Sequence, residues 1–157
     1  MKESFSIEKA TPEDSKTIFR LIKKEFPYFG LTETEVAERL GKENITVFKA
    51  RAKKNIAGFI ELEQIEQGIA RINGLTIKES FRGKNAAKTL LSHSIEFLKG
   101  HGTERVTLLV KQSNQRAKAL YKQFGFEYSG LYEKKIDGAT VEKMELSLFE
   151  PQPTQAA

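Results

Sequence analysis

The segment from residue 69 to residue 111 constrains the fold most, because it places a helical pattern between two strand patterns. Residues 69–77, IARINGLTI, and residues 105–111, RVTLLVK, are rich in β-branched side chains, and each predicts a strand. The apolar and small side chains between them recur at helical spacing and stop at Gly100; they are Ala87, Leu90, Leu91, Ser94, Ile95 and Leu98. A helix that connects two strands of one sheet forms a right-handed crossover, so the two strands lie parallel. The segment therefore predicts an α/β fold with a helix packed on one face of a sheet.

Strand and helix patterns continue on both sides of this crossover. Thr11-Pro12 begins a helix, Thr32 and Glu35 form a capping box, and Asp137-Gly138 is a strong hairpin turn. The predicted order is strand, two helices, three strands, helix, strand, helix and two strands, over residues 4–10, 12–26, 32–41, 45–52, 56–65, 69–77, 87–100, 105–111, 114–125, 126–136 and 141–149. We therefore expect a mixed α/β sheet of about seven strands with about four helices.

A chain of 157 residues has the length of one domain. No internal repeat or linker divides it, so we expect a single domain over residues 4–149. Residues 150–157 are polar and interrupted by proline, and we expect them to form a disordered tail.

Composition excludes several kinds of chemistry. The chain has no cysteine and two histidines, which excludes disulfides and thiolate metal sites, and we expect no metal. No apolar stretch approaches the roughly 18 residues of a membrane helix, so we expect a soluble, cytoplasmic protein with no membrane partner. The formal net charge of +5 favours an anionic ligand. Because Lys and Arg are spread along the chain, a phosphorylated small molecule suits it at least as well as nucleic acid.

The junction of strand and helix at residues 81–91, FRGKNAAKTLL, is a candidate phosphate site. The first amides of a helix have no internal acceptor and lie at the positive end of the helix dipole, so a turn of small residues there can bind a phosphate. The small residues are Gly83, Asn85, Ala86 and Ala87, and the cations are Arg82, Lys84 and Lys88. From composition alone, a solvated basic turn is an equal alternative. The patterns Gly-x4-Gly-Lys-Ser/Thr and Gly-x-Gly-x-x-Gly are absent, which argues against an NTP-type loop and a dinucleotide fold.

Two separated blocks, LTIKESFRGKNAAKTLL at residues 75–91 and VKQSNQRAKALYKQFGF at residues 110–126, resemble the GNAT superfamily of N-acetyltransferases. The pyrophosphate turn of that family has the form Gln/Arg-x-x-Gly-x-Gly/Ala. Here Arg82 fills its first position, Ala87 fills its last, and Asn85 stands where the middle glycine is usual. Asn tolerates a left-handed backbone, so the turn can still form. The resemblance covers residues 4–149 and is greatest to the protein amino-terminal and ribosomal-protein acetyltransferases.

The resemblance implies acetyl-CoA as cosubstrate and direct transfer of its acetyl group to an amine. Backbone groups of residues 75–77 would bind the pantetheine arm and the oxyanion, the amides of residues 83–88 would hold the pyrophosphate, and Tyr121 would protonate the departing thiolate. The cosubstrate-binding residues implied are Leu75, Thr76, Ile77, Arg82, Gly83, Lys84, Asn85, Ala86, Ala87, Lys88, Asn114 and Tyr121. From its spacing alone, Tyr121 is better interpreted as a core residue, because it shares an apolar stripe with Ala117 and Phe124; the resemblance reverses that interpretation.

No general base follows from the resemblance. Close family members carry a glutamate on the strand before the asparagine, where this chain has Leu109. Glu61 and Glu63 share one strand face and could accept the proton through water, although exposed strand carboxylates are usually only solvated. The amine could also lose its proton to water alone. The candidates for the wall of an acceptor pocket are Phe26, Tyr28, Phe29 and Tyr132.

The acceptor is open at this level. The resemblance favours a protein amino terminus or lysine, and the alternative is a small-molecule amine such as a polyamine, an amino acid or an aminoglycoside. The absence of an acidic cluster disfavours a polycation. A non-catalytic module that binds coenzyme A or nucleic acid is a further alternative, against which Tyr121 and the lack of interleaved basic and aromatic residues argue. We expect no specific nucleic-acid partner, and a homodimer is compatible with the sequence.

Overall fold

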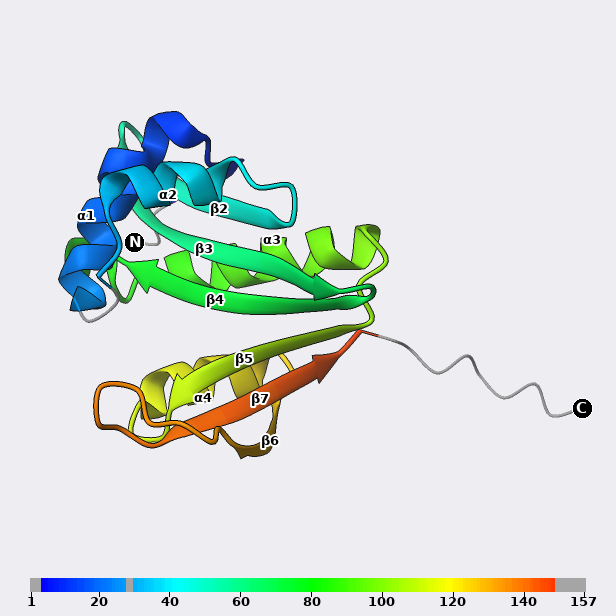
Figure 1. Cartoon of the computed structure of the whole chain (residues 1–157). Helices are drawn as coiled ribbons and strands as arrows, with labels where there is room; N and C mark the ends of the chain where they lie inside the picture. Colours follow the sequence, from blue (N-terminus) through cyan, green and yellow to red (C-terminus); the bar gives the residue numbers. More distant parts are fainter. Residues whose placement is uncertain (1–3, 28–29, 149–157) are drawn as a thin grey trace, which may run out of the picture.

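A seven-stranded mixed sheet forms the body of the protein (Figure 1). The computed structural model describes residues 4–27 and 30–148. The strands lie side by side in the order β1-β2-β3-β4-β5-β7-β6. They are β1 (Ser6–Lys9), β2 (Ile45–Ala52), β3 (Asn55–Glu66), β4 (Ile69–Ile77), β5 (Arg105–Lys111), β6 (Glu127–Leu131) and β7 (Val141–Ser147). The helices are α1 (Ser15–Glu25), α2 (Glu33–Leu40), α3 (Ala86–Gly100) and α4 (Gln115–Gln123), with short 3-10 turns η1 (Pro12–Asp14) and η3 (Glu79–Phe81). The predicted order of strands and helices is confirmed.

β4 and β5 are the parallel pair that the crossover predicts, with α3 between them in the chain. They pair only over Ile69–Ile72 and Arg105–Leu108. Beyond these residues β4 continues beside β3, and β5 continues beside β7. Figure 1 shows the two strands diverging toward their carboxyl ends. The sheet is therefore split into a V at this edge.

The divergence begins at an irregularity in β4. Against β3, Ile72 pairs with Leu62 and Gly74 pairs with Glu61, so Asn73 is an extra residue between two consecutive pairs. An extra residue of this kind, a β-bulge, bends its strand and increases the local twist. The bend thus falls on the first residue after the last parallel pair.

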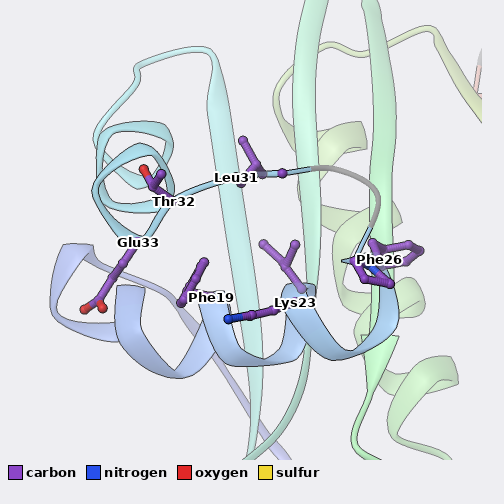
Figure 2. Close-up of a pocket in the computed structure, with 9 residues that line it drawn as sticks. Phe19, Lys23, Phe26, Leu31, Thr32 and Glu33 are labelled. Atoms are coloured by element: carbon purple, nitrogen blue, oxygen red, sulfur yellow. The ribbon is translucent and has the colours of Figure 1, made fainter.

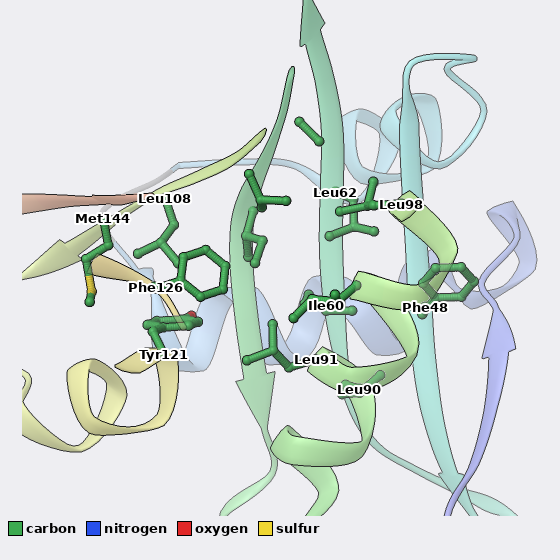
Figure 3. Close-up of a cluster of buried hydrophobic side chains, with 14 of the residues drawn as sticks. Phe48, Ile60, Leu62, Leu90, Leu91, Leu98, Leu108, Tyr121, Phe126 and Met144 are labelled. Atoms are coloured by element: carbon green, nitrogen blue, oxygen red, sulfur yellow. The ribbon is translucent and has the colours of Figure 1, made fainter. Parts of the chain in front are cut away.

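Helices cover both faces of the sheet, and each face has its own hydrophobic cluster. The larger cluster joins α3 and α4 to β2–β5 and β7, and Figure 3 shows Leu90 and Leu91 of α3 packed against Ile60 of β3. On the opposite face, Ile18 of α1 and Val36 of α2 pack in a smaller cluster with β2 and β3. α2 begins and ends close to its predicted bounds, because its cap and apolar stripe are local signals. The helix predicted over residues 12–26 begins as the 3-10 turn η1, and α1 follows from Ser15 to Glu25.

One predicted element is different in the structure. The Asp137-Gly138 turn forms, with left-handed φ angles of 50° and 73° and a bridge between Ile136 and Ala139. However, β6 ends at Leu131, so the prediction of a strand over residues 126–136 is wrong. β6 shifts its register against β7 between Tyr128 and Gly130, where φ is 139°, resumes the pairing through Leu131 and Glu142, and then gives way to a loop over residues 132–140. The tail expected over residues 150–157 lies outside the described residues.

Candidate active site

The edge of β4 that faces the V carries the residues predicted to bind the pantetheine arm. Leu75, Thr76 and Ile77 pair with residues 58–60 of β3 on one side. On the other side, the described residues of β5 provide them with no partner, because the parallel pairing stops at Ile72. Exposed backbone groups on a strand edge can pair with an extended ligand as an added strand would.

Thr76 adds an unsatisfied hydroxyl to this edge. The residue is 4% exposed, and its Oγ1 is buried without a hydrogen-bond partner among the described residues. Burying a hydroxyl without a partner costs about 1–3 kcal/mol. A buried hydroxyl of this kind fits a site in which a bound ligand completes the hydrogen bond.

Gly58 allows the end of β4 to lie against β3. A Cβ placed on Gly58 would be 2.3 Å from the carbonyl oxygen of Thr76 and 3.0 Å from the Cα of Ile77. Both of these neighbours are backbone atoms, which cannot move aside as the end of a flexible side chain can. Only glycine therefore permits this approach, and it fixes the position of the β4 backbone at the mouth of the V.

The turn between β4 and α3 has the left-handed geometry that a phosphate cradle requires. Gly83 has φ 78°, and Asn85, the N-cap residue of α3, has φ 69° and ψ 12°. The expectation that Asn85 adopts a left-handed conformation is therefore confirmed. The backbone N–H of Thr89 donates to the carbonyl of Asn85 at 3.0 Å, and this is the first hydrogen bond of the helix. The amides of the first turn have no acceptor within the helix. A Cβ at Gly83 would meet nothing within 4 Å, so the turn is open to a ligand.

Arg82 begins this turn, but its guanidinium is engaged by protein groups. Its Nε donates to the carbonyl of Ile77 at 3.2 Å, and its Nη2 donates to Oε1 of Glu25 at 2.7 Å. A second, exposed ion pair joins Lys24 to Glu79 at 3.8 Å. Arg82 therefore ties the end of α1 to the turn, while Lys88 is exposed beside it.

A shallow groove of about 480 Å³ runs beside the first turns of α3. It is lined by Ile7, Lys88, Thr89, Ser92, His93 and Phe124. The cation of Lys88 and the aromatic ring of Phe124 are groups that suit the phosphate and base of a nucleotide. The groove adjoins the turn at residues 83–88, because Lys88 belongs to both.

Tyr121 lies on the buried face of α4. The residue is 7% exposed, and its ring packs edge-on against Phe126 with 5.5 Å between centroids, as Figure 3 shows. Leu75 and Ile77 pack against the same hydrophobic cluster, so Tyr121 and these two side chains lie on the same side of the sheet. Burial raises the pKa of Tyr121 to about 12. The phenol is therefore protonated at neutral pH and can donate a proton.

Asn114 caps α4. Its side-chain oxygen accepts from the backbone N–H of Ala117 at 3.1 Å. The side-chain NH2 group is not used by this cap. Beneath the same helix, Lys118 pairs with the buried Glu142 at 3.2 Å, which anchors α4 to β7.

Glu61 and Glu63 lie on the sheet face that α1 and α2 cover, and both are held by cations. Arg39 of α2 makes a two-pronged ion pair with Glu61, and Arg71 of β4 pairs with Glu63 at 3.2 Å. Asn73 donates to Glu61 at 2.7 Å and to Glu63 at 2.8 Å. The hydrogen bond from Asn73 is the main cause that lowers the pKa of Glu63, with Arg71 as a further cause. The hydrogen bond to Glu61 correspondingly raises the pKa of Arg39.

Asn73, Arg39 and Arg71 were not among the candidates from the sequence. A glycine inside a strand pattern indicates a bulge, so the Asn73-Gly74 pair did carry a signal. No local spacing connects Arg39 with Glu61, because they are 22 residues apart and meet only when α2 packs on the sheet.

The remaining candidates from the sequence are Leu109 and four aromatic residues. Leu109, at the position where the resemblance implies a glutamate, is half-buried in β5. Phe26 lines a pocket of about 290 Å³ between α1 and α2, together with Phe19, Ile22 and Leu31 (Figure 2). Tyr28 and Phe29 lie outside the described residues, and Tyr132 is half-buried at the start of the loop before β7.

Two observations concern other kinds of site. Among residues 4–27 and 30–148, no three His, Cys, Asp or Glu side chains gather as a metal-binding group. No helix in the described part of the chain is long and apolar enough to span a membrane.

Comparison of the sequence with protein families matches the acetyltransferase (GNAT) family over residues 15–126. A putative ribosomal protein bS18-alanine N-acetyltransferase of Bacillus subtilis is 36% identical over 62 residues, which are 40% of this chain and 41% of that protein. An uncharacterised N-acetyltransferase of the same organism is 31% identical over 93 residues, 58% of this chain and 62% of that protein. The matched regions thus span about two fifths and three fifths of these relatives.

Solved structures share the fold. The ribosomal-protein-S18-alanine N-acetyltransferase from Escherichia coli superimposes with a TM-score of 0.83 at 18% identity, over 96% of this chain and 98% of that one. An N-acetyltransferase from Thermoplasma acidophilum in complex with coenzyme A gives a TM-score of 0.75 at 22% identity, over 92% and 99% of the two chains. At these identities the likeness concerns the fold. The family match over residues 15–126, together with the split sheet, shows that the chain belongs to the acetyltransferase (GNAT) family.

Proposed function

We propose that the acceptor is an amine of a protein, either an amino terminus or a lysine side chain. We place the acceptor on the sheet face that α1 and α2 cover. The observation that carries the proposal is that both glutamates on this face are neutralised, because Arg39 holds Glu61 and Arg71 holds Glu63. A polyamine needs carboxylates that are free to pair with its several ammonium groups, and this pair is already compensated. The similarity to protein acetyltransferases supports the same choice. We place the reaction in the cytoplasm.

The residues of this chain fit acetyl-CoA along one continuous path. The free edge of residues 75–77 would take the pantetheine arm, with the unsatisfied Thr76 hydroxyl as an additional hydrogen-bonding group. The amide group of Asn114 would bind the same arm from the other side of the V. The left-handed turn at residues 83–88 would take the pyrophosphate, with Lys84 and Lys88 as cations. Arg82 would either release Glu25 and contact a phosphate, or keep its ion pair with Glu25 and so hold the turn in place.

In the proposed reaction, a neutral amine attacks the thioester carbonyl, and a C–N bond forms as the C–S bond breaks. The amides of residues 75–77 stabilise the negative charge that develops on the carbonyl oxygen. Tyr121 donates its phenolic proton to the departing sulfur, and the acetylated nitrogen loses its surplus proton. Because burial raises the pKa of Tyr121 to about 12, the phenol keeps its proton throughout the physiological pH range.

The amine also needs an acceptor for its surplus proton. Glu61 and Glu63 are the predicted bases, acting through water. The lowered pKa of Glu63 makes it a weaker proton acceptor than an ordinary glutamate. Glu61→Gln tests the other carboxylate: if Glu61 is the base, the variant lowers kcat at neutral pH. An unchanged kcat would exclude Glu61 as the base.

The experiment for the acceptor measures release of free coenzyme A thiol from acetyl-CoA with a panel of amines. We expect turnover with peptides that carry a free amino terminus or lysine, and little with spermidine or aminoglycosides. Amino-terminally blocked peptides with and without lysine separate the two protein amines. Preferential turnover of a polyamine would refute the proposed acceptor class while leaving the acetyltransferase itself intact.

A further inference from the structure

Asn73 is fully hydrogen-bonded at the point where the sheet splits. Its Nδ2 donates to Glu61 at 2.7 Å and to Glu63 at 2.8 Å, and its Oδ1 accepts from the Nε of Arg71 at 2.8 Å. A carboxamide has two N–H donors on nitrogen, so both are used here, and its oxygen is occupied as well. The side chain therefore has one defined orientation, set by three partners on β3 and β4.

The backbone of the same residue is the β-bulge of β4. Ile72 still pairs with Leu108 of β5, whereas the residues after Asn73 pair only with β3 among the described strands. Gly74 follows, and a Cβ there would meet nothing within 4 Å, so the sheet face beyond the bulge is open. The angle at which residues 75–77 leave β5 is thus determined at Asn73.

We propose that Asn73 is a positioning residue for the thioester, and that Glu61 and Glu63 act on the reaction by holding it. The carboxylates fix the carboxamide, the carboxamide fixes the bulge, and the bulge directs those backbone amides of residues 75–77 that face the V toward the carbonyl oxygen of the acetyl group. Arg39 and Arg71 neutralise the two carboxylates, so that two glutamates can lie side by side on β3. The inference rests on the proposed site for acetyl-CoA.

The arrangement separates two parts of cosubstrate binding. The bulge acts on the amides that contact the acetyl group, whereas the pyrophosphate turn at residues 83–88 is a separate segment held by α3. Loss of the carboxamide should therefore weaken acetyl-CoA more than coenzyme A. A general loss of structure would instead lower the affinity for both ligands together.

The test uses Asn73→Leu, which keeps the size of the side chain and removes its three hydrogen bonds. Calorimetric titration measures the affinity for acetyl-CoA and for coenzyme A, and steady-state assays give kcat and KM. We expect kcat to fall about 10- to 100-fold, which is less than the roughly 10²- to 10³-fold loss on removal of an oxyanion donor, because the amides remain and are only misaligned. We also expect the preference for acetyl-CoA over coenzyme A to fall at least about fivefold, with the affinity for coenzyme A within about threefold of the unmodified chain.

Two variants of Glu63 separate positioning from base catalysis. Glu63→Gln keeps an oxygen that can accept from Asn73, so the preference for acetyl-CoA should be retained. Glu63→Leu removes that oxygen and with it one of the three hydrogen bonds, so it should show part of the loss seen with Asn73→Leu. It also carries the comparison if Asn73→Leu does not fold. Glu8→Gln is the matched control, because it breaks an ion pair with Arg51 at the far edge of the sheet and should change none of these quantities.

Three results would overturn the inference. The first is an unchanged kcat and ligand preference in Asn73→Leu. The second is an equal loss of both ligands accompanied by a lower melting temperature, which would make Asn73 a structural residue only. The third is a loss of ligand preference in Glu63→Gln. If the unmodified chain neither binds acetyl-CoA nor releases thiol, the proposed site fails instead, and that outcome is distinct from all three.

Discussion

Replacing Tyr121 with phenylalanine should affect catalysis and stability very differently. The substitution removes one oxygen and keeps the ring that packs against Phe126 with 5.5 Å between centroids. No hydrogen bond joins the Tyr121 hydroxyl to another described residue, so its loss leaves no partner unsatisfied within the described structure. We therefore expect the free energy of unfolding to change by less than about 1 kcal/mol.

The catalytic effect should be much larger. A positioned general acid contributes about 10²- to 10⁴-fold to the rate, which corresponds to roughly 2.7–5.5 kcal/mol of the activation barrier. Because the hydroxyl acts on the sulfur only as the C–S bond breaks, the loss should appear in kcat and not in the affinity for acetyl-CoA. The pKa of about 12 further predicts that Tyr121 does not produce a titration limb near neutral pH.

The assay combines chemical denaturation, calorimetric titration with acetyl-CoA and steady-state thiol release. Tyr128→Phe is the matched control, because Tyr128 is 57% exposed on β6 and the same atom is removed. Turnover of Tyr121→Phe within threefold of the unmodified chain would refute the role of the acid. A loss of more than about 2 kcal/mol of stability would show that the hydroxyl has a structural partner.

Three further predictions concern the backbone and the pH dependence. Gly58→Ala should lower the free energy of unfolding by about 1–3 kcal/mol in thermal melts, because its Cβ would lie 2.3 Å from the carbonyl oxygen of Thr76. Gly100→Ala, whose Cβ meets nothing within 4 Å, should be neutral or stabilising. Similar losses for both variants would contradict the steric argument. Asn85→Gly should keep or improve the affinity for acetyl-CoA in calorimetry. Asn85→Val should weaken it, since a left-handed φ of 69° costs a β-branched residue about 1–2 kcal/mol. A large loss with glycine would show that the asparagine side chain itself binds acetyl-CoA. The pKa of Glu63 is lowered in the folded chain, so its contribution to stability is present above the pKa of an unfolded glutamate and is lost as pH falls through the folded pKa. The difference in unfolding free energy between the unmodified chain and Glu63→Gln should therefore shrink in acid. A difference that grows in acid would contradict the lowered pKa.

The parts of the fold that could be predicted depend on local signals. The crossover follows from the helical spacing between two β-branched runs, and the turn at Asn85 follows from the tolerance of asparagine for a left-handed backbone. Tyr121 was placed on a buried face from its spacing alone, and it is buried. In the closing hairpin the local turn forms, but β6 ends before it, since the extent of a strand depends on pairing with β7 and not on the turn residues alone.

The parts of the site that could not be predicted depend on contacts between distant residues. The role of Arg82 at a phosphate stays a prediction, but the contact of its guanidinium with Glu25, 57 residues away in the chain, has no local signal in the sequence. Glu61 and Glu63 were seen as two carboxylates on a strand face, while the groups that define their chemistry come from α2 and β4. Whether a carboxylate is a base or an anchor depends on such neighbours, which spacing along the chain does not reveal.

The short parallel pairing of β4 with β5 also has a consequence for how the molecule opens. Four residue pairs form the only ladder between the block β1–β4 and the block β5–β7 within the described sheet, and α3 packs chiefly on the first block. Every other neighbouring pair of strands is antiparallel. The two blocks therefore meet at a narrow seam, and the amides of this ladder should be the first strand amides in the interior of the sheet to exchange with solvent deuterium. A ligand that lies across the V joins both blocks, so acetyl-CoA should slow exchange at the seam more than at the outer strands.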